Sequence, residues 1–236
     1  MATVDKFTVL TEGTLKVTGR LIDASNATLY ATVTLEDQEV VCIYKPIAGE
    51  RPLWDFADGS LAHREYSAYL VSQALGFHIV PLTILRDGPY GVGMVQEWIT
   101  LNEGIDLASF FSTDNPSLRS MALFDAIVNN TDRKIGHLLP VSEDEVYGCD
   151  HGVTFHVDDK LRTVLWQWAD DSFTDSEIEL LQNAEKLLRG DLSHHLKPFI
   201  TPAEIDATLM RVERLLSEGK FPLPNPDWPA IPWPAF

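Results

Sequence analysis

The sequence predicts an α+β protein in which a strand-rich part precedes a helical part. Before residue 100, short runs rich in Val, Thr, Ile and Tyr alternate with turn-forming residues, which is typical of strands. After residue 104, segments with apolar residues at helical spacing begin with capping residues. Strands followed by helices indicate an α+β architecture with a cleft between the two parts. We therefore predict a strand-rich part with one helix over 1–99, a helical part over 100–221 and a Pro- and Trp-rich tail over 222–236.

The first predicted strands form an antiparallel meander. They span 14–22, 27–35 and 39–45, and the segments 23–26 and 36–38 between them are turn-like. In the third strand, Lys45 shares a face with Val41 and Ile43, because alternate residues of a strand point the same way. An ammonium group on an apolar face needs an anionic partner, unless it reaches water at the end of the strand.

One helix is predicted in the strand-rich part, over 60–75. Ser60 fits the N-cap, and Gly76 fits the C-terminal stop. Glu65 falls on the inward stripe of this helix and also needs a partner. The other members of that stripe are Leu61, Ala68, Tyr69 and Ser72. We expect Glu65 to pair with Lys45; the alternative is a pair with Arg64, or with water at a solvated edge.

The remaining elements follow in order along the chain. Two further strands are expected at 79–85 and 90–98, and the polar, Gly-containing stretch 100–104 is the natural hinge. Helices are expected at 106–111, 116–128, 174–188 and 202–218. Thr174 with Glu177, and Thr201 with Glu204, form capping boxes at the start of the last two. Gly219 closes the final helix.

The composition indicates a globular protein whose negative net charge repels polyanions. Hydrophobic residues make up 45% and charged residues 22%, as in ordinary soluble domains. A net charge of −17 repels nucleic-acid phosphates and anionic lipid headgroups, so no nucleic-acid partner is expected. No apolar run approaches the length of about 18 residues that a spanning helix needs, so no membrane insertion is expected. No signal peptide is visible, and we expect a cytoplasmic protein in which Cys42 and Cys149 are free thiols.

The most informative motif runs from Asn129 to His137 and is followed by Asp150-His151-Gly152. Asp132 lies in a polar loop after a predicted helix, His137 follows as a possible metal ligand, and Asp150 comes at the end of a short apolar strand. In phosphoryl transfer from ATP, one carboxylate orients the acceptor hydroxyl and another holds the divalent metal. Each half of the motif alone also fits a capped polar turn, but the two together favour phosphoryl transfer.

Upstream residues occur in the order that kinases use. Lys45 is the expected partner of the nucleotide phosphates, and Glu65 on the following helix would position it. The turn with Ser25, Asn26 and Thr28 is placed to cover the phosphates with backbone N–H groups and hydroxyls, although it has no glycine run. These features predict ATP and a divalent metal as cofactors.

These residues resemble the atypical kinases of the phosphatidylinositol 3- and 4-kinase superfamily. The segment 125–133 is similar to the catalytic loop of type II phosphatidylinositol 4-kinases and, more distantly, of HipA-type toxin kinases. The segments 64–70 and 43–46 are similar to their first-lobe helix and their ATP-lysine strand. Over residues 14–220 the chain also resembles a bacterial, typically actinobacterial, family of kinase-like proteins.

The resemblance implies a bilobal protein-kinase-like fold and a role for each residue. Lys45 would hold the α- and β-phosphates, and Glu65 would pair with it. Asp132 would be the catalytic acid, and Asp150 would be the chief ligand of a magnesium or manganese ion. The adenine would be bracketed by Val95, Gln96, Glu97 and Trp98.

His137 departs from the family pattern, which places Asn at this point of the loop. Imidazole suits manganese, iron or zinc better than magnesium. His137 therefore either ligates the metal with Asp150 or is a structural residue bonded to Asp150 or Asp132.

Three functions follow. The leading hypothesis is an atypical kinase that transfers the γ-phosphoryl group to a hydroxyl of a lipid, an inositol-like molecule, a nucleotide or a protein. A pseudokinase that binds nucleotide and regulates a partner is the first alternative. The second is a metal-dependent phosphohydrolase that uses Asp132, His137, Asp150 and His151.

The tail cannot be helical, because its prolines remove hydrogen-bond donors and fix φ. We expect it to pack on the domain through Trp228, Trp233 and Phe236. The alternative is that it binds a partner protein as an extended segment.

Overall fold

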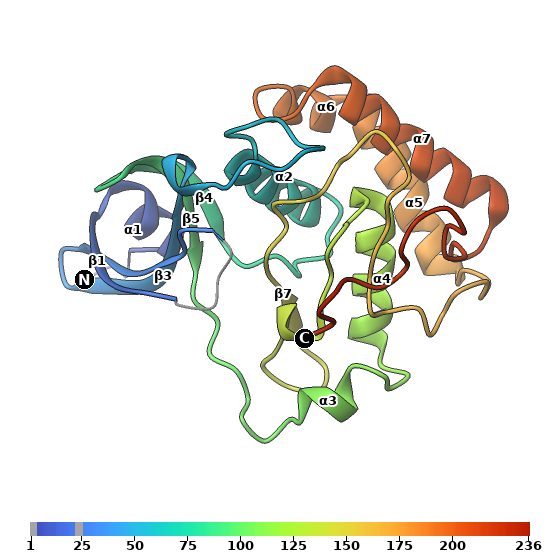
Figure 1. Ribbon diagram of the computed structural model, residues 1–236, viewed down its shortest axis with the longest axis horizontal. Coiled ribbons are helices and arrows are strands. Elements are labelled where there is room, and N and C mark those ends of the chain that lie inside the picture. The colour runs from blue at the N-terminus through green and yellow to red at the C-terminus, as the bar shows by residue number, and fades with distance from the viewer. Residues whose placement is uncertain (1–3, 22–25) are drawn as a thin grey trace.

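The computed structural model describes residues 4–21 and 26–236, and it confirms the predicted α+β architecture. A sheet lies on one side of the molecule and most helices on the other (Figure 1). In the described part of the chain the five sheet strands follow the order β1-β2-β3-β5-β4, and all neighbours are antiparallel. The strands are β1 (Thr14–Arg20), β2 (Leu29–Leu35), β3 (Gln38–Pro46), β4 (Thr83–Gly88) and β5 (Gly91–Glu97).

The sheet region contains a helix that the sequence analysis missed. Helix α1 (Lys6–Glu12) begins after Asp5, whose carboxylate accepts the backbone N–H of Thr8. Its Val9 and Leu10 are buried in a core cluster on one face of the sheet. A Thr- and Val-containing helix of two turns has weak intrinsic propensity, so this packing stabilises it.

The strand β3 presents two different faces. Val40, Cys42 and Tyr44 are buried in one cluster with residues of α1, β2, β4 and β5, whereas the intervening residues are only partly buried. Lys45 therefore lies on the opposite face from Tyr44, as predicted from strand alternation. This face points toward the rest of the molecule.

The helical region surrounds a second and larger core. Its elements are α3 (Leu107–Phe110), α4 (Pro116–Val128), α5 (Asp175–Leu188), α6 (Asp191–Leu196), α7 (Pro202–Glu218), the 3-10 turn η2 (Ile135–His137) and the short hairpin of β6 (Leu138–Pro140) and β7 (Val146–Gly148). Both predicted capping boxes are present. Helix α4 ends at Asn129, whose φ of 53° is left-handed.

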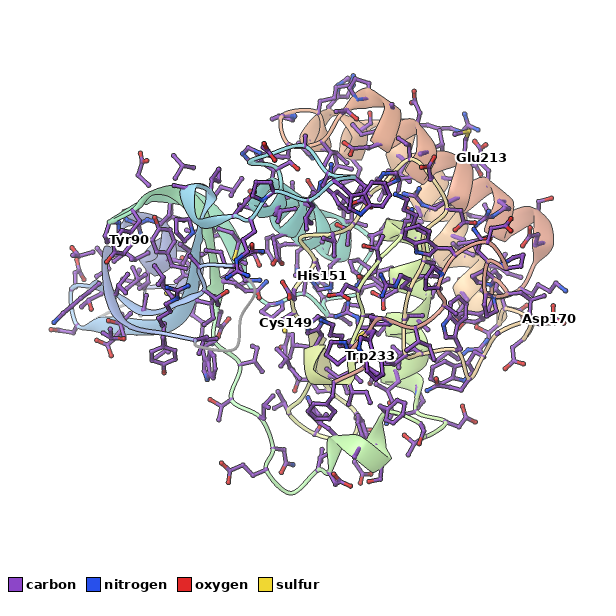
Figure 2. All side chains as sticks on the ribbon, in the orientation of Figure 1. Tyr90, Cys149, His151, Asp170, Glu213 and Trp233 are labelled. Carbon is purple, nitrogen blue, oxygen red and sulfur yellow. The ribbon has the colours of Figure 1, made fainter. Side chains whose placement is uncertain are left out.

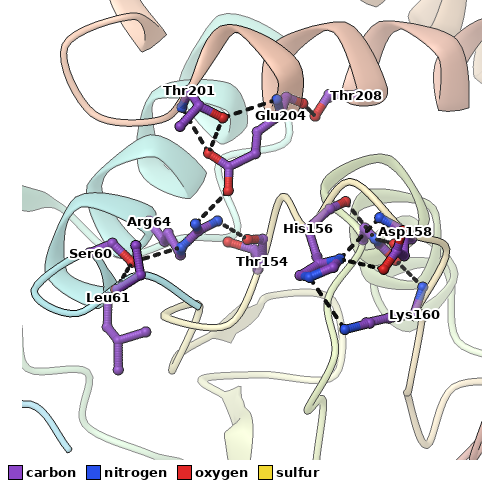
Figure 3. Close-up of polar contacts among 12 residues, drawn as sticks. Ser60, Leu61, Arg64, Thr154, His156, Asp158, Lys160, Thr201, Glu204 and Thr208 are labelled. Carbon is purple, nitrogen blue, oxygen red and sulfur yellow. Dashed lines mark hydrogen bonds and ion pairs between the residues drawn. The ribbon is translucent and has the colours of Figure 1, made fainter. Parts of the chain in front are cut away.

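Helix α2 (Leu61–Ala74) follows the 3-10 turn η1 (Ile47–Gly49) and joins the two regions. It contacts β4 and β5, yet its Ala68, Val71 and Leu75 belong to the larger core. Arg64 on α2 is buried, donates to the Thr154 carbonyl at 2.7 Å and forms an ion pair with Glu204 at the start of α7 (Figure 3). The helix is thus fixed against the helical region by a buried charge pair.

The tail crosses the helical region as an extended segment (Figure 1). The Ala230 carbonyl accepts the Thr163 N–H at 3.0 Å and the Trp166 Nε1–H at 2.9 Å, and the Ala235 carbonyl accepts the Ile135 N–H at 2.8 Å. Packing through aromatic side chains is only partly found. Trp228 lies 5.0 Å from the Lys160 ammonium, whereas Trp233 and Phe236 are 90% and 65% exposed. The backbone, and not these two rings, attaches the end of the tail.

The described helices contain none that is both long enough and apolar enough to cross a membrane.

Candidate functional site

Three of the predicted residues meet at one point between the sheet and the helical region. The Lys45 ammonium on β3 lies 2.7 Å from Oε1 of Glu65 on α2 and 2.7 Å from Oδ1 of Asp150 after β7. The predicted pairing of Lys45 with Glu65 is thus confirmed. Figure 2 shows Cys149 and His151, the neighbours of Asp150, in the middle of the molecule.

The second oxygen of Glu65 reaches the loop that carries Asp150. It accepts the backbone N–H of His151 at 2.9 Å. Lys45, Glu65, the His151 amide and Asp150 therefore form a closed ring of contacts. Asp150 itself has a φ of 61°, a left-handed conformation that a non-glycine residue adopts at some cost, so its surroundings must hold it there.

The charges within this ring support one another. Burial alone would lower the pKa of Lys45, but Asp150 and Glu65 outweigh it and raise the pKa. The Lys45 charge holds the pKa of Asp150 well below its usual range against the opposing effect of burial. Burial raises the pKa of Glu65, and Lys45 counteracts only part of that shift. Lys45 is therefore charged and Asp150 ionised at neutral pH.

Asp132 sits in a tightly bonded loop after α4. Its backbone N–H is donated to Oδ1 of Asn130 at 3.0 Å, and the Asn130 amide donates to Asp125 at 2.9 Å. The Asp132 carboxylate itself is 30% exposed and lies 3.2 Å from the Lys134 ammonium. The loop thus fixes the backbone at Asp132 and leaves the carboxylate open to a reactant.

His137 faces Asp150. Its Nδ1 accepts the Lys134 backbone N–H at 3.4 Å, and its Nε2 lies 3.4 Å from Oδ2 of Asp150. Burial lowers the pKa of His137, more than the nearby Asp150 raises it, so the ring is neutral. With Nδ1 as acceptor, the neutral ring carries its proton on Nε2. This tautomer donates toward Asp150 and has no Nε2 lone pair for a metal.

The turn expected to cover phosphates is only partly described. Ser25 lies outside the described residues. Asn26 and Lys45 line one small pocket with Asp150, and Oδ1 of Asn26 accepts the Arg51 backbone N–H at 2.9 Å. Thr28 is buried. Asn26 is therefore the described member of the turn that lies beside the charged ring.

In the segment expected to hold adenine, successive side chains of β5 point to opposite faces of the sheet. Val95 pairs with Tyr44 and is buried with it in the core of the sheet region, so its side chain points away from Lys45. The backbone N–H groups of Glu97 and Trp98 donate to Leu82 and Val41. The buried side chain of Gln96 donates to Thr83 at 2.9 Å. The Trp98 ring packs edge-on against Tyr30, 5.2 Å between centroids.

Two basic residues, Arg64 and Arg133, form ion pairs with carboxylates outside the ring of Lys45, Glu65 and Asp150. Arg64 pairs with Glu204, as described above, and Arg133 is fully buried against Asp125 with distances of 2.8 and 2.9 Å. The Asp125 carboxylate accepts hydrogen bonds from the side chains of both Arg133 and Asn130.

Sequence reasoning missed the role of Arg133 and the buried state of His151. The adjacency of Arg133 to Asp132 was visible, but nothing local distinguishes a buried arginine from an exposed one. Within residues 4–21 and 26–236, no three or more His, Cys, Asp or Glu side chains converge as a possible metal site.

Comparison with known proteins finds a relative in sequence and solved structures of similar shape. No family model matches the chain. The Helicobacter pylori proinflammatory kinase CtkA is similar in structure, with a TM-score of 0.48, 10% sequence identity, and 90% of this chain and 94% of that chain covered. Protein Rv2133c of Mycobacterium tuberculosis is 42% identical over 267 aligned positions, which cover 98% of this chain and 96% of the relative. The chain therefore belongs to the same protein family as Rv2133c.

Proposed function

We propose that the protein is an ATP- and divalent-metal-dependent phosphotransferase of the atypical kinase type. The observation that carries this proposal is the contact of one ammonium, that of Lys45, with both Glu65 and Asp150. Protein kinases require a strand lysine paired with a helix glutamate, together with an aspartate that holds magnesium. Here the three residues come from β3, α2 and the loop after β7, in that order.

The nucleotide would bind with its phosphates beside Lys45. Asn26 and Ala27 line the same pocket, so the described part of the proposed phosphate turn lies beside Lys45. The adenine would lie along the segment 95–98, against backbone carbonyls and the residues whose side chains share the Lys45 face. Met94 pairs with Lys45 across the strands, and Gln96 pairs with Ile43, so alternation puts both on that face.

The divalent ion would be held by Asp150. A bound magnesium or manganese ion supplies charge neutralisation of the phosphates. Asp150 suits it because the carboxylate is ionised and 46% of its side chain is exposed. His137 would join as a second ligand only if its proton moved from Nε2 to Nδ1, which would break the contact with the Lys134 amide.

Asp132 would orient the acceptor hydroxyl. Its carboxylate is partly exposed, and its backbone is held by Asn130. Oriented in this way, it accepts a hydrogen bond from the hydroxyl and takes its proton as the phosphoryl group transfers.

The resemblance to phosphatidylinositol 3- and 4-kinases leaves the acceptor open among a lipid, an inositol-like molecule, a nucleotide and a protein. The net charge of −17 disfavours approach to an anionic bilayer, so a freely diffusing acceptor fits this molecule better.

A pseudokinase is the second candidate, and one observation favours it. Oδ1 of Asp150 contacts Lys45 and Oδ2 faces His137, so protein groups already surround the proposed metal ligand. If Asp150 kept these contacts with nucleotide bound, it would not hold the metal, and nucleotide would bind without turnover.

Release or transfer of phosphate from γ-labelled ATP tests the proposal. We expect turnover with magnesium or manganese, and loss of turnover in Asp132→Asn. Nucleotide binding without turnover, with any of several acceptors or water, would support the pseudokinase instead. Metal-dependent cleavage of simple phosphoesters in the absence of ATP would support the phosphohydrolase.

A further inference from the structure

Arg133 is the largest fully buried side chain in the described part of the protein. Its Nε and Nη2 form a two-point ion pair with Asp125 on α4, at 2.9 and 2.8 Å. Charged side chains are rarely buried without a reason, and this one is neutralised by a single carboxylate. The guanidinium still has donors directed elsewhere.

Those donors reach the residues on both sides of Asp150. Nη1 donates to the carbonyl of Cys149 at 3.0 Å, and Nη2 lies 2.6 Å from Nε2 of His151. Because a guanidinium only donates, Nε2 of His151 must be the acceptor, and His151 is the neutral Nδ1–H tautomer. Burial, reinforced by Arg133, lowers the pKa of His151 well below its usual value, which agrees with a neutral ring.

The same residue also fixes the loop of Asp132. The Arg133 N–H is donated to the Arg162 carbonyl at 3.0 Å, and the Arg133 carbonyl accepts the Val164 N–H at 3.1 Å. The backbone of Arg133 is thus fixed next to Asp132, and its side chain contacts Cys149 and His151, the two neighbours of Asp150. Asp150 keeps a left-handed φ between those two contacts.

We propose that Arg133 is a positioning residue that sets the spacing between Asp132 and Asp150. It does this by clamping Cys149 and His151 around Asp150, and it touches neither nucleotide nor acceptor. The roles of the two acids rest on the proposed function. The contacts by which Arg133 holds the loop 149–151 do not depend on it.

Gly148 provides an independent way to disturb the clamp. A Cβ added at this position would lie 3.1 Å from Nη1 and 3.2 Å from Nη2 of Arg133, which is tighter than an ordinary contact. Gly148→Ala should therefore shift the guanidinium without removing any hydrogen-bonding group. At Gly190, an added Cβ would lie 3.5 Å from the nearest atom, an ordinary contact, so Gly190→Ala is the matched control.

The test compares His151→Leu, which removes the acceptor of Nη2, with His151→Gln, which offers an amide oxygen in its place. Hydrogen exchange of the 147–153 segment and maleimide labelling of Cys149 are measured first. We expect both rates to rise about 10-fold in His151→Leu, less in Gly148→Ala, and to return toward wild type in His151→Gln. Cys42, which is buried in the sheet region, is the internal control thiol and should label at its wild-type rate.

Affinity for manganese in the presence of ATP is measured next. Removing a group that orients a metal ligand commonly lowers metal affinity about 10–100-fold. We expect manganese affinity to fall about 10-fold in His151→Leu and to be restored in His151→Gln. Unchanged exchange and labelling at 147–153 in both His151→Leu and Gly148→Ala would overturn the clamp. Exchange that rises equally throughout α4 would also overturn it, because that would show general destabilisation. If the clamp responds as expected but wild type binds no ATP with metal, the proposed function fails and the clamp stands.

Discussion

The Lys45 ammonium lies 2.7 Å from a carboxylate oxygen of Asp150, although 105 positions separate the two residues in the sequence. The contact joins the sheet to the loop after β7, and Glu65 connects both ends by accepting from Lys45 and from the His151 amide. Lys45 and Glu65 are charged and largely buried, whereas Asp150 is partly exposed. Removing one of these charges should therefore lower the stability of the fold as well as alter the chemistry proposed for the site.

The first prediction concerns this buried pair. Lys45→Met leaves Glu65, which is 1% exposed, without its cation, and we expect a loss of about 3–5 kcal/mol in the free energy of unfolding. Adding Glu65→Gln should recover most of that loss, because the unpaired charge disappears. Urea denaturation measures both. Lys6→Met is the control, since Lys6 pairs with Glu97 at the surface and should cost below about 1 kcal/mol. Equal losses in Lys45→Met and Lys6→Met would refute the prediction.

The second prediction concerns ligand stabilisation. At a free ATP concentration of about 100 Kd, binding stabilises the folded state by roughly 2.7 kcal/mol. For a chain of this size, Tm should rise by about 5–11 °C when ATP and a divalent metal are added together. The double variant Lys45→Met with Glu65→Gln should remain folded but lose most of the shift. A full shift in that variant would remove Lys45 from nucleotide binding.

The third prediction concerns pH. The folded state keeps His151 neutral with a pKa well below 6.5, whereas the unfolded chain protonates near that value. As pH falls below about 6.5 the unfolded state binds the extra proton, so stability falls, by up to about 1.4 kcal/mol per pH unit for this one group. The pKa of His137 is lowered as well and adds to the trend. In His151→Gln the slope between pH 6.5 and 5 should flatten, measured by urea midpoints.

His194→Gln serves as the control for that experiment, because His194 is exposed on α6. Its slope should match wild type. A slope that is unaffected in His151→Gln would mean that His151 is not the titrating group.

The fourth prediction concerns the metal. We propose that His137, as the Nε2–H tautomer, donates to Asp150 and does not ligate the ion. We therefore expect His137→Asn to leave the ratio of manganese to magnesium affinity, measured with ATP by calorimetry, nearly unchanged. A shift of that ratio toward magnesium would show instead that His137 ligates the ion, because imidazole favours manganese over magnesium.

Much of the fold follows from local sequence signals. The meander, the α2 helix and the capping boxes were predicted to within a few residues, because turn residues and caps define most of their ends. The start of α2 differs, because the Ser60 side chain makes no capping hydrogen bond and the Glu50 carboxylate accepts the Leu61 and Ala62 N–H groups instead. Strand β4 begins at Thr83, later than expected, since Pro81 supplies no N–H and the Ile79 and Val80 amides bond to the Ser72 hydroxyl. Helix α1 depends on packing against the sheet, which local propensity does not reveal.

The candidate site was predictable to a similar extent. Lys45 and Glu65 each lay on an apolar face and so required a partner, and together with the order of these residues in kinases that requirement favoured the pair that the structure contains. By contrast, the burial of Arg133 and its grip on Cys149 and His151 depend on how separate segments meet. The direction of the Val95 side chain, away from Lys45, likewise depends on the register of β5 against β3.

Calorimetric titration with ATP and manganese of wild type, Asp132→Asn and Asp150→Asn tests the central claim most directly. Asp150 is proposed to hold the ion that bridges the phosphates, so Asp150→Asn should lose metal-dependent ATP binding. Asp132 is proposed to orient the acceptor, a contribution of about 10²–10⁴-fold to the rate, so Asp132→Asn should bind ATP like wild type. Intact binding in Asp150→Asn, or the absence of metal-dependent binding in wild type, would contradict the account.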